Sequence, residues 1–220
     1  MPDFLLPTAF IDSAAPNIVA FARQAAGDEN DEVARAVRLY YAVRDGIVYT
    51  PYCDFRSLDT FRASAVLARG DGFCVGKAAV LAAVARASGI PARVGFADVR
   101  NHLCTPRLRA LVGGDVFYYH GYTEMAVAGR WVKATPAFDR VLCDKFGVRP
   151  LEFDGRSDSL FHAYDRGGRR HMEYLRDHGA HADVPADEIV ATFAREYPRL
   201  MESSPRASDT QFRREAEESA

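Results

Sequence analysis

The chain has little that would suit a metal, a polyanion or a membrane. Its four cysteines are widely spaced and contain no Cys-x-x-Cys pair, which argues against a zinc ribbon or a thioredoxin-like site. Lysine plus arginine (28) nearly balances aspartate plus glutamate (30), so no net field favours nucleic acid or an anionic membrane. No apolar run reaches the roughly 18 residues that a membrane span needs.

The N-terminus also lacks the features of an export signal. Asp3 stands where such a signal carries basic residues, and Pro7 interrupts the short apolar stretch. We therefore expect a cytoplasmic protein in which all four cysteines are free thiols. The acidic run at 28–32 lacks the glycine that a calcium loop requires, and it is better interpreted as the start of a helix.

At 220 residues the chain is long enough for one well-buried core. We predict a single domain over residues 1–200, with its core at about 33–140 and a C-terminal excursion and helix at 141–200. Within that excursion, residues 154–185 are rich in glycine, aspartate, arginine and histidine, and we expect them to be only partly ordered. Residues 201–220 are polar and charged, so we expect a disordered tail.

The hydrophobic periodicity changes along the chain from helical to alternating. Helices are predicted at 31–45, 63–69, 74–88 and 186–197. Strands are predicted at 46–49, 92–97, 117–127 and 131–134, the last two joined by a hairpin turn.

A cysteine that opens an apolar helix is the most informative feature. Cys74 follows Gly70 and Gly72 and begins the helix predicted at 74–88. Free backbone N–H groups and the positive end of the helix dipole favour thiolate over thiol there. Cys74 is therefore the candidate nucleophile, and the alternative is a small buried hydrophobe. The other cysteines, at positions 53, 104 and 143, lack such a setting and are interpreted as structural.

One of the six histidines lies in a predicted strand among aromatic residues. This residue, His120, is a candidate general base, because burial in a strand can fix one ring nitrogen and aim the other. A hydrogen-bonded core histidine is the alternative. His171, His178 and His181 lack the i, i+4 spacing of a helical metal site, so we expect no metal.

The residues around these two candidates form extended motifs. Residues 70–78 follow Gly-x-Gly-x-Cys-x-x-Lys-Ala, and 89–93 read Gly-Ile-Pro-Ala-Arg. His-Gly-Tyr-Thr-Glu at 120–124 precedes Gly-Arg-Trp-Val at 129–132. In order and spacing these motifs resemble the transglutaminase-like superfamily over about residues 33–140. The resemblance implies a papain-like α+β fold whose nucleophile helix packs on an antiparallel sheet that carries the base. It also implies thioester chemistry without a cofactor.

One position departs from the pattern of that family. Four residues after the hairpin Trp131 the family usually has an aspartate that orients the histidine, and here the residue is Thr135. A hydroxyl is a weaker, neutral acceptor. Asp139, four residues further on, is the candidate third member of a Cys-His-Asp triad, and an ordinary turn carboxylate is the alternative. If neither residue reaches His120, weak activity is expected.

The prediction is a cysteine enzyme that acts on a peptide or another amide, either as a protease or amidase or as an acyltransferase. Cys74 attacks the carbonyl, His120 transfers the proton, and Asp139 or Thr135 orients the ring. The alternative is a non-catalytic binding module that retains the fold, which the missing aspartate at position 135 favours. An acetyltransferase of the arylamine type would need a coenzyme A site, which nothing in the sequence marks.

Overall fold

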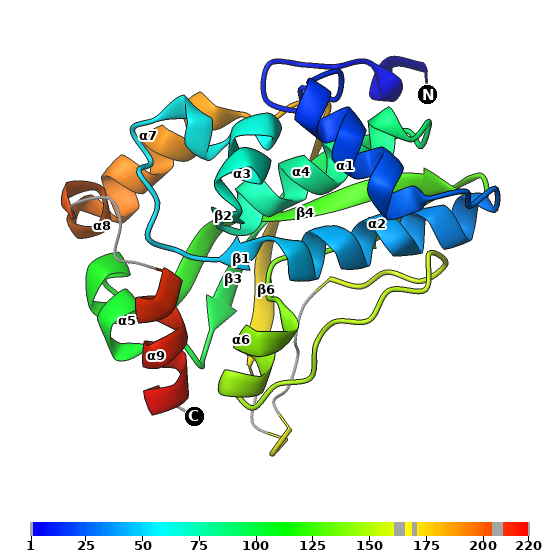
Figure 1. The fold of residues 1–220 in the computed structure, drawn as a ribbon. Helices are drawn as coiled ribbons and strands as arrows, with labels where there is room; N and C mark the ends of the chain where they lie inside the picture. Colours follow the sequence, from blue (N-terminus) through cyan, green and yellow to red (C-terminus); the bar gives the residue numbers. More distant parts are fainter. Residues whose placement is uncertain (1, 161–165, 169–170, 204–208, 220) are drawn as a thin grey trace.

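The computed structural model describes residues 2–160, 166–168, 171–203 and 209–219 (Figure 1). Its helices are η1 (Pro2–Leu5), α1 (Pro16–Ala26), α2 (Glu32–Gly46), η2 (Leu58–Thr60), α3 (Ala63–Arg69), α4 (Cys74–Ala87), α5 (Pro106–Val112), α6 (Arg140–Lys145), α7 (Ala186–Glu196), α8 (Pro198–Glu202) and α9 (Asp209–Ser219). Its strands are β1 (Val48–Tyr49), β2 (Asp71–Gly72), β3 (Ala92–Asn101), β4 (Val116–Val127), β5 (Arg130–Ala134) and β6 (Met172–His181). None of the helices in these ranges is long and apolar enough to cross a bilayer.

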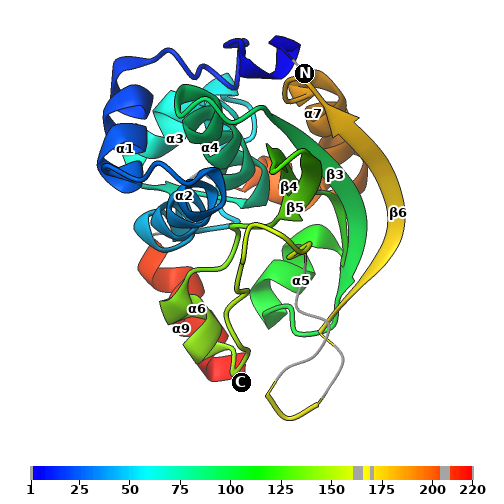
Figure 2. The ribbon, with the colours of Figure 1, turned by 90° about the vertical axis from the view of Figure 1, so that its right-hand side faces the viewer.

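An antiparallel sheet with the order β5-β4-β3-β6 forms the frame of the molecule. The central pair runs from Ala92 opposite Met125 to Arg100 opposite Val116. Figure 2 shows β6 at the outer edge of this sheet and helices α1 to α4 gathered on the other side. Strands β1 and β2 form a separate, short parallel pair beside it. The predicted α+β architecture is confirmed.

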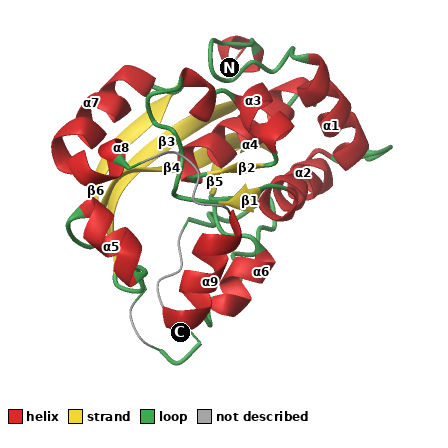
Figure 3. Cartoon of the chain, turned by 60° about the vertical axis from the view of Figure 1, so that its left-hand side comes forward, coloured by secondary structure: helices red, strands yellow, loops and turns green. Residues whose placement is uncertain are grey.

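Helix α4 is the buried centre of the helical layer and packs on β4 and β3 (Figure 3). Every residue from Cys74 to Arg86 is buried, as expected for a helix that is apolar nearly all round. The helix ends before Gly89, whose φ of 79° only glycine adopts easily. The Thr123 hydroxyl on β4 donates a hydrogen bond of 2.8 Å to the Ala78 carbonyl, which ties helix to sheet.

A buried lysine fixes α4 to α2. Lys77 is fully buried, and its Nζ donates to the carbonyls of Arg44 and Ile47 at 2.8 and 2.6 Å. Burial lowers the pKa of Lys77 to about 7. At its other end α2 begins as predicted, because Asp31 caps it by accepting a hydrogen bond from the Ala34 N–H.

The expectation for residues 154–185 is corrected by strand β6. This strand pairs with β3 from Val94 opposite His181 to Asn101 opposite Met172. Its side chains are mostly polar and half-exposed or exposed, so the sequence pattern carries no clear alternation. Backbone pairing with β3 forms the strand, which local sequence does not reveal. Residues 161–165 and 169–170 of the expected excursion lie outside the described residues.

The expectation of a disordered tail is corrected over 209–219. Helix α9 buries Phe212 and Ala216, one helical turn apart. The Phe212 ring packs against Tyr49 and Tyr52, with centroid distances of 5.7 and 5.8 Å. Two apolar residues on one face are enough to dock this helix, because they pack against residues that are distant in the sequence. Residues 201–202 belong to α8, and 204–208 and 220 lie outside the described residues.

Candidate active site

The thiol of Cys74 lies at the start of α4, among free backbone N–H groups. Phe73, the residue before the helix, provides no side-chain cap. The N–H groups of Cys74, Val75 and Gly121 hydrogen bond to the thiol and favour the thiolate, but burial outweighs them and raises the pKa of Cys74 to about 11. Desolvation thus reverses the effect that the helix N-terminus alone predicts. At neutral pH the resting group is a thiol.

Strand β4 meets the first turn of α4 at Gly121. A Cβ at this position would lie 2.8 Å from the Val75 Cα and 3.3 Å from the Cys74 carbonyl carbon. Any side chain would therefore push the strand away from the helix. Glycine here allows the residue next to it, His120, to share a pocket with the thiol.

A bulge in the sheet sets the position of His120. The ladder pairs Ala97 with His120 and Val99 with Phe117, so Asp98 faces two residues of β4. One of them, Tyr119, has a φ of 55°, which is strained for a residue with a side chain. Asp98 Oδ1 accepts the Tyr119 N–H at 3.1 Å and lies 2.7 Å from His178 Nε2.

The His120 ring is buried and neutral. Burial alone lowers its pKa to about 4. Within the described parts of the chain, no hydrogen bond or ion pair reaches the ring. Its side chain is therefore held by packing and by the backbone of β4, with no carboxylate to stabilise an imidazolium.

Cys74 and His120 line the same pocket. Its walls come from the segment after β1, from α5, from the start of β4 and from α7 and α8. The structure thus brings the predicted nucleophile and the predicted base together at one opening.

Thr135 lies on the opposite side of His120. The two residues line a second, smaller cavity, together with Ala137, Phe138 and Met172 among others. The Thr135 hydroxyl is buried and has no hydrogen-bond partner within the described residues. The position that carries the orienting aspartate in related proteins is therefore beside the histidine here, but it offers only an unpaired hydroxyl.

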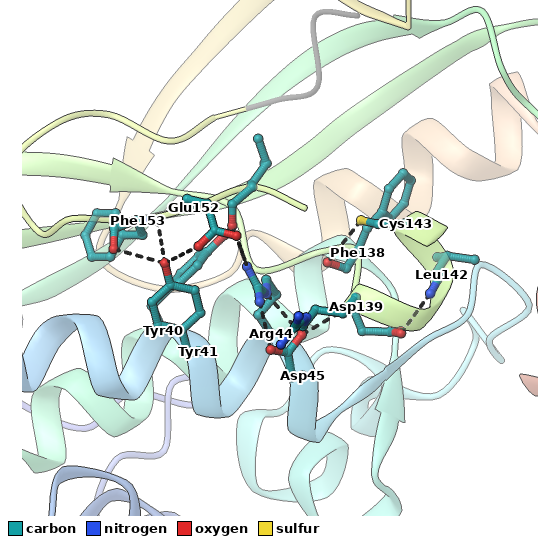
Figure 4. A network of polar contacts seen from close by, with 12 residues as sticks. Tyr40, Tyr41, Arg44, Asp45, Phe138, Asp139, Leu142, Cys143, Glu152 and Phe153 are labelled. Atoms are coloured by element: carbon teal, nitrogen blue, oxygen red, sulfur yellow. Dashed lines mark hydrogen bonds and ion pairs between the residues drawn. The ribbon is translucent and has the colours of Figure 1, made fainter. Parts of the chain in front are cut away.

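Asp139 has other partners. It caps α6 by accepting the Leu142 N–H at 3.0 Å, and the same oxygen accepts from Arg213 of α9 at 3.2 Å. Its second oxygen accepts the Tyr49 N–H at 3.4 Å. Figure 4 shows Asp139 beside α6, at the edge of a network around Arg44. Among the described contacts none joins Asp139 to His120, so the structure does not bring this predicted residue to the base.

The remaining thiols and histidines form no second centre in the described residues. Burial raises the pKa of Cys53, Cys104 and Cys143 to about 12 in each case. Across the described ranges, no group of three histidine, cysteine, aspartate or glutamate side chains is arranged to hold a metal. His178 bonds to Asp98.

Two parts of the site escaped the sequence analysis. Asp98, which fixes the bulge before His120, shows no motif of its own. The pocket wall from the C-terminal helices includes Phe193, Tyr197 and Leu200. Their spacing of four and then three residues is the pattern of one helical face. This spacing could have indicated in the sequence that the three side chains lie on one surface.

Comparison with known proteins agrees with this geometry. The family model of the transglutaminase-like superfamily matches residues 19–136, more than half of the chain. The chain belongs to the transglutaminase-like superfamily. Its antiparallel sheet and helix α4 form a mixed α+β fold.

A solved structure from Cytophaga hutchinsonii, described as a "putative cysteine protease", is similar at 18% identity with a TM-score of 0.46. The match covers 60% of this chain and 40% of that protein. A search of curated proteins found no match.

Proposed function

We propose that this protein is a cysteine enzyme that cleaves or transfers the acyl group of an amide through a thioester on Cys74. The observation that carries the proposal is the single pocket lined by both Cys74 and His120. Membership of the transglutaminase-like superfamily supports it. The substrate class is a peptide or another amide, and no cofactor enters the chemistry. A reducing, cytoplasmic compartment would keep the thiol free, and we propose that location.

The reaction starts from a neutral pair. His120 accepts the thiol proton as the sulfur attacks the carbonyl carbon, and the carbonyl electron pair moves to the oxygen. Backbone N–H groups at the first turn of α4 would stabilise that oxyanion. When the C–N bond breaks, the imidazolium gives its proton to the leaving nitrogen. Water or an amine then attacks the thioester, and the thiol is regenerated.

Thr135 takes the place of an orienting carboxylate in this proposal. Its buried, unpaired hydroxyl lies beside His120, whereas the oxygens of Asp139 are held by Leu142, Tyr49 and Arg213. A neutral hydroxyl stabilises an imidazolium less than a carboxylate does. We therefore expect modest turnover, with acylation as the slow step.

An activated ester tests the proposal directly. Incubation with a p-nitrophenyl ester of an N-acylated amino acid should add one acyl group, seen by intact mass and mapped to Cys74. Cys74→Ala should form no adduct and release no nitrophenol above background. Cys104→Ala, which removes another buried thiol, is the matched control and should react like the wild type.

The second half of the reaction separates hydrolysis from transfer. The acyl-enzyme is allowed to decay with and without a primary amine, and the products are identified by mass. Free acid alone indicates a hydrolase, and an amide product indicates an acyltransferase. Binding of an N-acylated amide without any adduct on Cys74 would contradict the proposal and favour the binding-module alternative.

A further inference from the structure

The wall of the Cys74 pocket defines one chemical class of acyl group. We infer that the acyl side of the substrate carries a bulky, uncharged apolar group, such as an aromatic or branched aliphatic side chain. The C-terminal helices α7 and α8 together with α5 would hold it. This inference rests on the proposed function and specifies its substrate.

The lining of the pocket is apolar in character. Aromatic rings of Phe55, Phe73, Phe117 and Phe193 face it, and α5 adds the aliphatic residues Leu108 and Val112. No aspartate, glutamate, lysine or arginine belongs to the described lining. Burying a charge in such surroundings without a partner is strongly unfavourable, so the pocket selects against charged groups. The aromatic and aliphatic side chains of this lining can contact a ring or a branched chain held beside the thiol.

The tyrosine hydroxyls of the wall offer few polar contacts. The Tyr197 hydroxyl donates to the Val116 carbonyl at 3.0 Å and accepts from the Tyr118 N–H at 2.6 Å. The Tyr118 hydroxyl interacts with Glu196. Among the described residues this leaves the Tyr49 hydroxyl, Cys74 and His120 as the polar side-chain groups of the lining that a substrate can contact. These groups lie near the reacting thiol and serve the scissile amide, so a polar side chain of the substrate would find no side-chain partner in the wall.

The wall is rigid, and part of it lies outside the family core. The ring of Phe193 packs against Phe55 and Phe73 with centroid distances of 5.2 and 6.4 Å. Phe193, Tyr197 and Leu200 follow the segment 19–136 that matches the family. The shared core thus provides the reacting pair, and the C-terminal helices of this chain shape the acyl pocket.

A series of covalent reagents tests the inference on the wild-type protein. N-acetyl chloromethyl ketones of phenylalanine, leucine, glycine and glutamate each place one side chain on the acyl side. The sulfur of Cys74 bonds to the methylene carbon, chloride leaves with the electron pair, and His120 takes the thiol proton. We expect the phenylalanine reagent to label Cys74 faster than the glycine reagent, by on the order of 100-fold. The glutamate reagent should be slowest.

Filling the pocket should remove this preference. Val112→Phe on α5 places a ring in the pocket and should abolish the advantage of the phenylalanine reagent. Labelling by iodoacetamide, which is small, measures how far the thiol remains reachable in this variant. Leu111→Phe, on the same helix but outside the lining, is the matched control and should keep the preference. Leu200→Trp is a second filling variant in case Val112→Phe does not fold.

The outcomes separate the two claims. Equal labelling of Cys74 by all four chloromethyl ketones would overturn the apolar acyl pocket and leave the cysteine chemistry intact. Failure of every reagent, iodoacetamide included, to label Cys74 at any pH up to that of its titration would overturn both the pocket and the proposed function.

Discussion

Two polar regions of the molecule are built in opposite ways. In the network of Figure 4, Arg44 donates to both oxygens of Asp45 and to the Leu151 carbonyl, and Asp139 holds the start of α6. At the candidate active site, the Thr135 hydroxyl is buried with no hydrogen-bond partner in the described chain, and no described residue bonds to the ring of His120. In the first region these polar groups are hydrogen-bonded to one another or to the backbone, and in the second region they are not.

This difference separates a structural role from a reactive one. Buried polar groups are nearly always paired, because leaving one unpaired costs about 1–3 kcal/mol. The paired network stabilises the junction of α2, α6 and the loop after α6. In the second region the Thr135 hydroxyl is unpaired and no described residue bonds to the ring of His120, so the neutral imidazole stays available for a substrate. Each prediction below alters one of these two regions, or makes the His120 site resemble the Arg44 network.

The largest effect is expected from His120→Ala. This change removes the base and should slow acylation of Cys74 by a p-nitrophenyl ester roughly 100- to 10,000-fold. The initial rate of nitrophenol release measures it. His102→Ala, a partly exposed histidine in the loop after β3, is the control and should acylate at the wild-type rate. Equal rates for wild type and His120→Ala would remove His120 from the reaction.

On the network side, Arg44→Ala should lower the free energy of unfolding by about 2 kcal/mol, because it removes the hydrogen bonds of a buried guanidinium to Asp45 and to the Leu151 carbonyl. The Arg44 side chain is 3% exposed. Arg38→Ala on the same helix removes a guanidinium that is 51% exposed and should cost less than about 1 kcal/mol. Urea denaturation measures both. Similar losses in the two variants would mean that the network contributes no special stability.

The lowered pKa of His120 predicts a pH-dependent stability. Its pKa is about 4 when folded, against an ordinary 6.5, so between these values the unfolded chain binds more protons. Stability from this residue is complete above pH 6.5 and is lost as the pH falls toward 4. Between pH 7 and pH 5 the wild type should lose about 2 kcal/mol more than His120→Gln. Parallel stability curves for the two proteins would show that His120 titrates normally.

Thr135→Asp makes the active site resemble the network. A carboxylate beside His120 should raise the pKa of the ring and increase the acylation rate roughly tenfold. Thr135→Val keeps the shape of the side chain without its hydroxyl and should change the rate less. An unchanged acylation rate in Thr135→Asp, with folding intact by circular dichroism, would show that position 135 does not act on His120.

Elements with strong local signals were predicted well from the sequence. Helix α3 begins and ends at the predicted residues, and α4 ends one residue early, because glycines and an apolar pattern mark them. Strand β6 was missed because its order comes from pairing with β3. Helix α9 was missed because it buries little apolar surface, through Phe212 and Ala216, and because its polar partners, such as Asp139, are distant in sequence. Both are tertiary effects that a local pattern does not contain.

The site was predicted only in part, for a similar reason. Motif spacing singled out Cys74 and His120, and the structure places both in one pocket. The protonation states were not foreseen, since the helix N-terminus favours a thiolate and only three-dimensional burial reveals the opposing desolvation. The partners of Asp139 are equally non-local, because Arg213 lies 74 residues further along the chain.

The central claim is that Cys74 and His120 rest as a buried, neutral pair without a carboxylate. The rate of Cys74 alkylation by iodoacetamide, followed from pH 5 to pH 11.5 by peptide mass spectrometry, tests it most directly. We expect the rate to be low at neutral pH and to rise continuously toward the thiol pKa of about 11. A plateau of high reactivity that begins well below pH 8 would show a preformed thiolate–imidazolium pair and contradict the account.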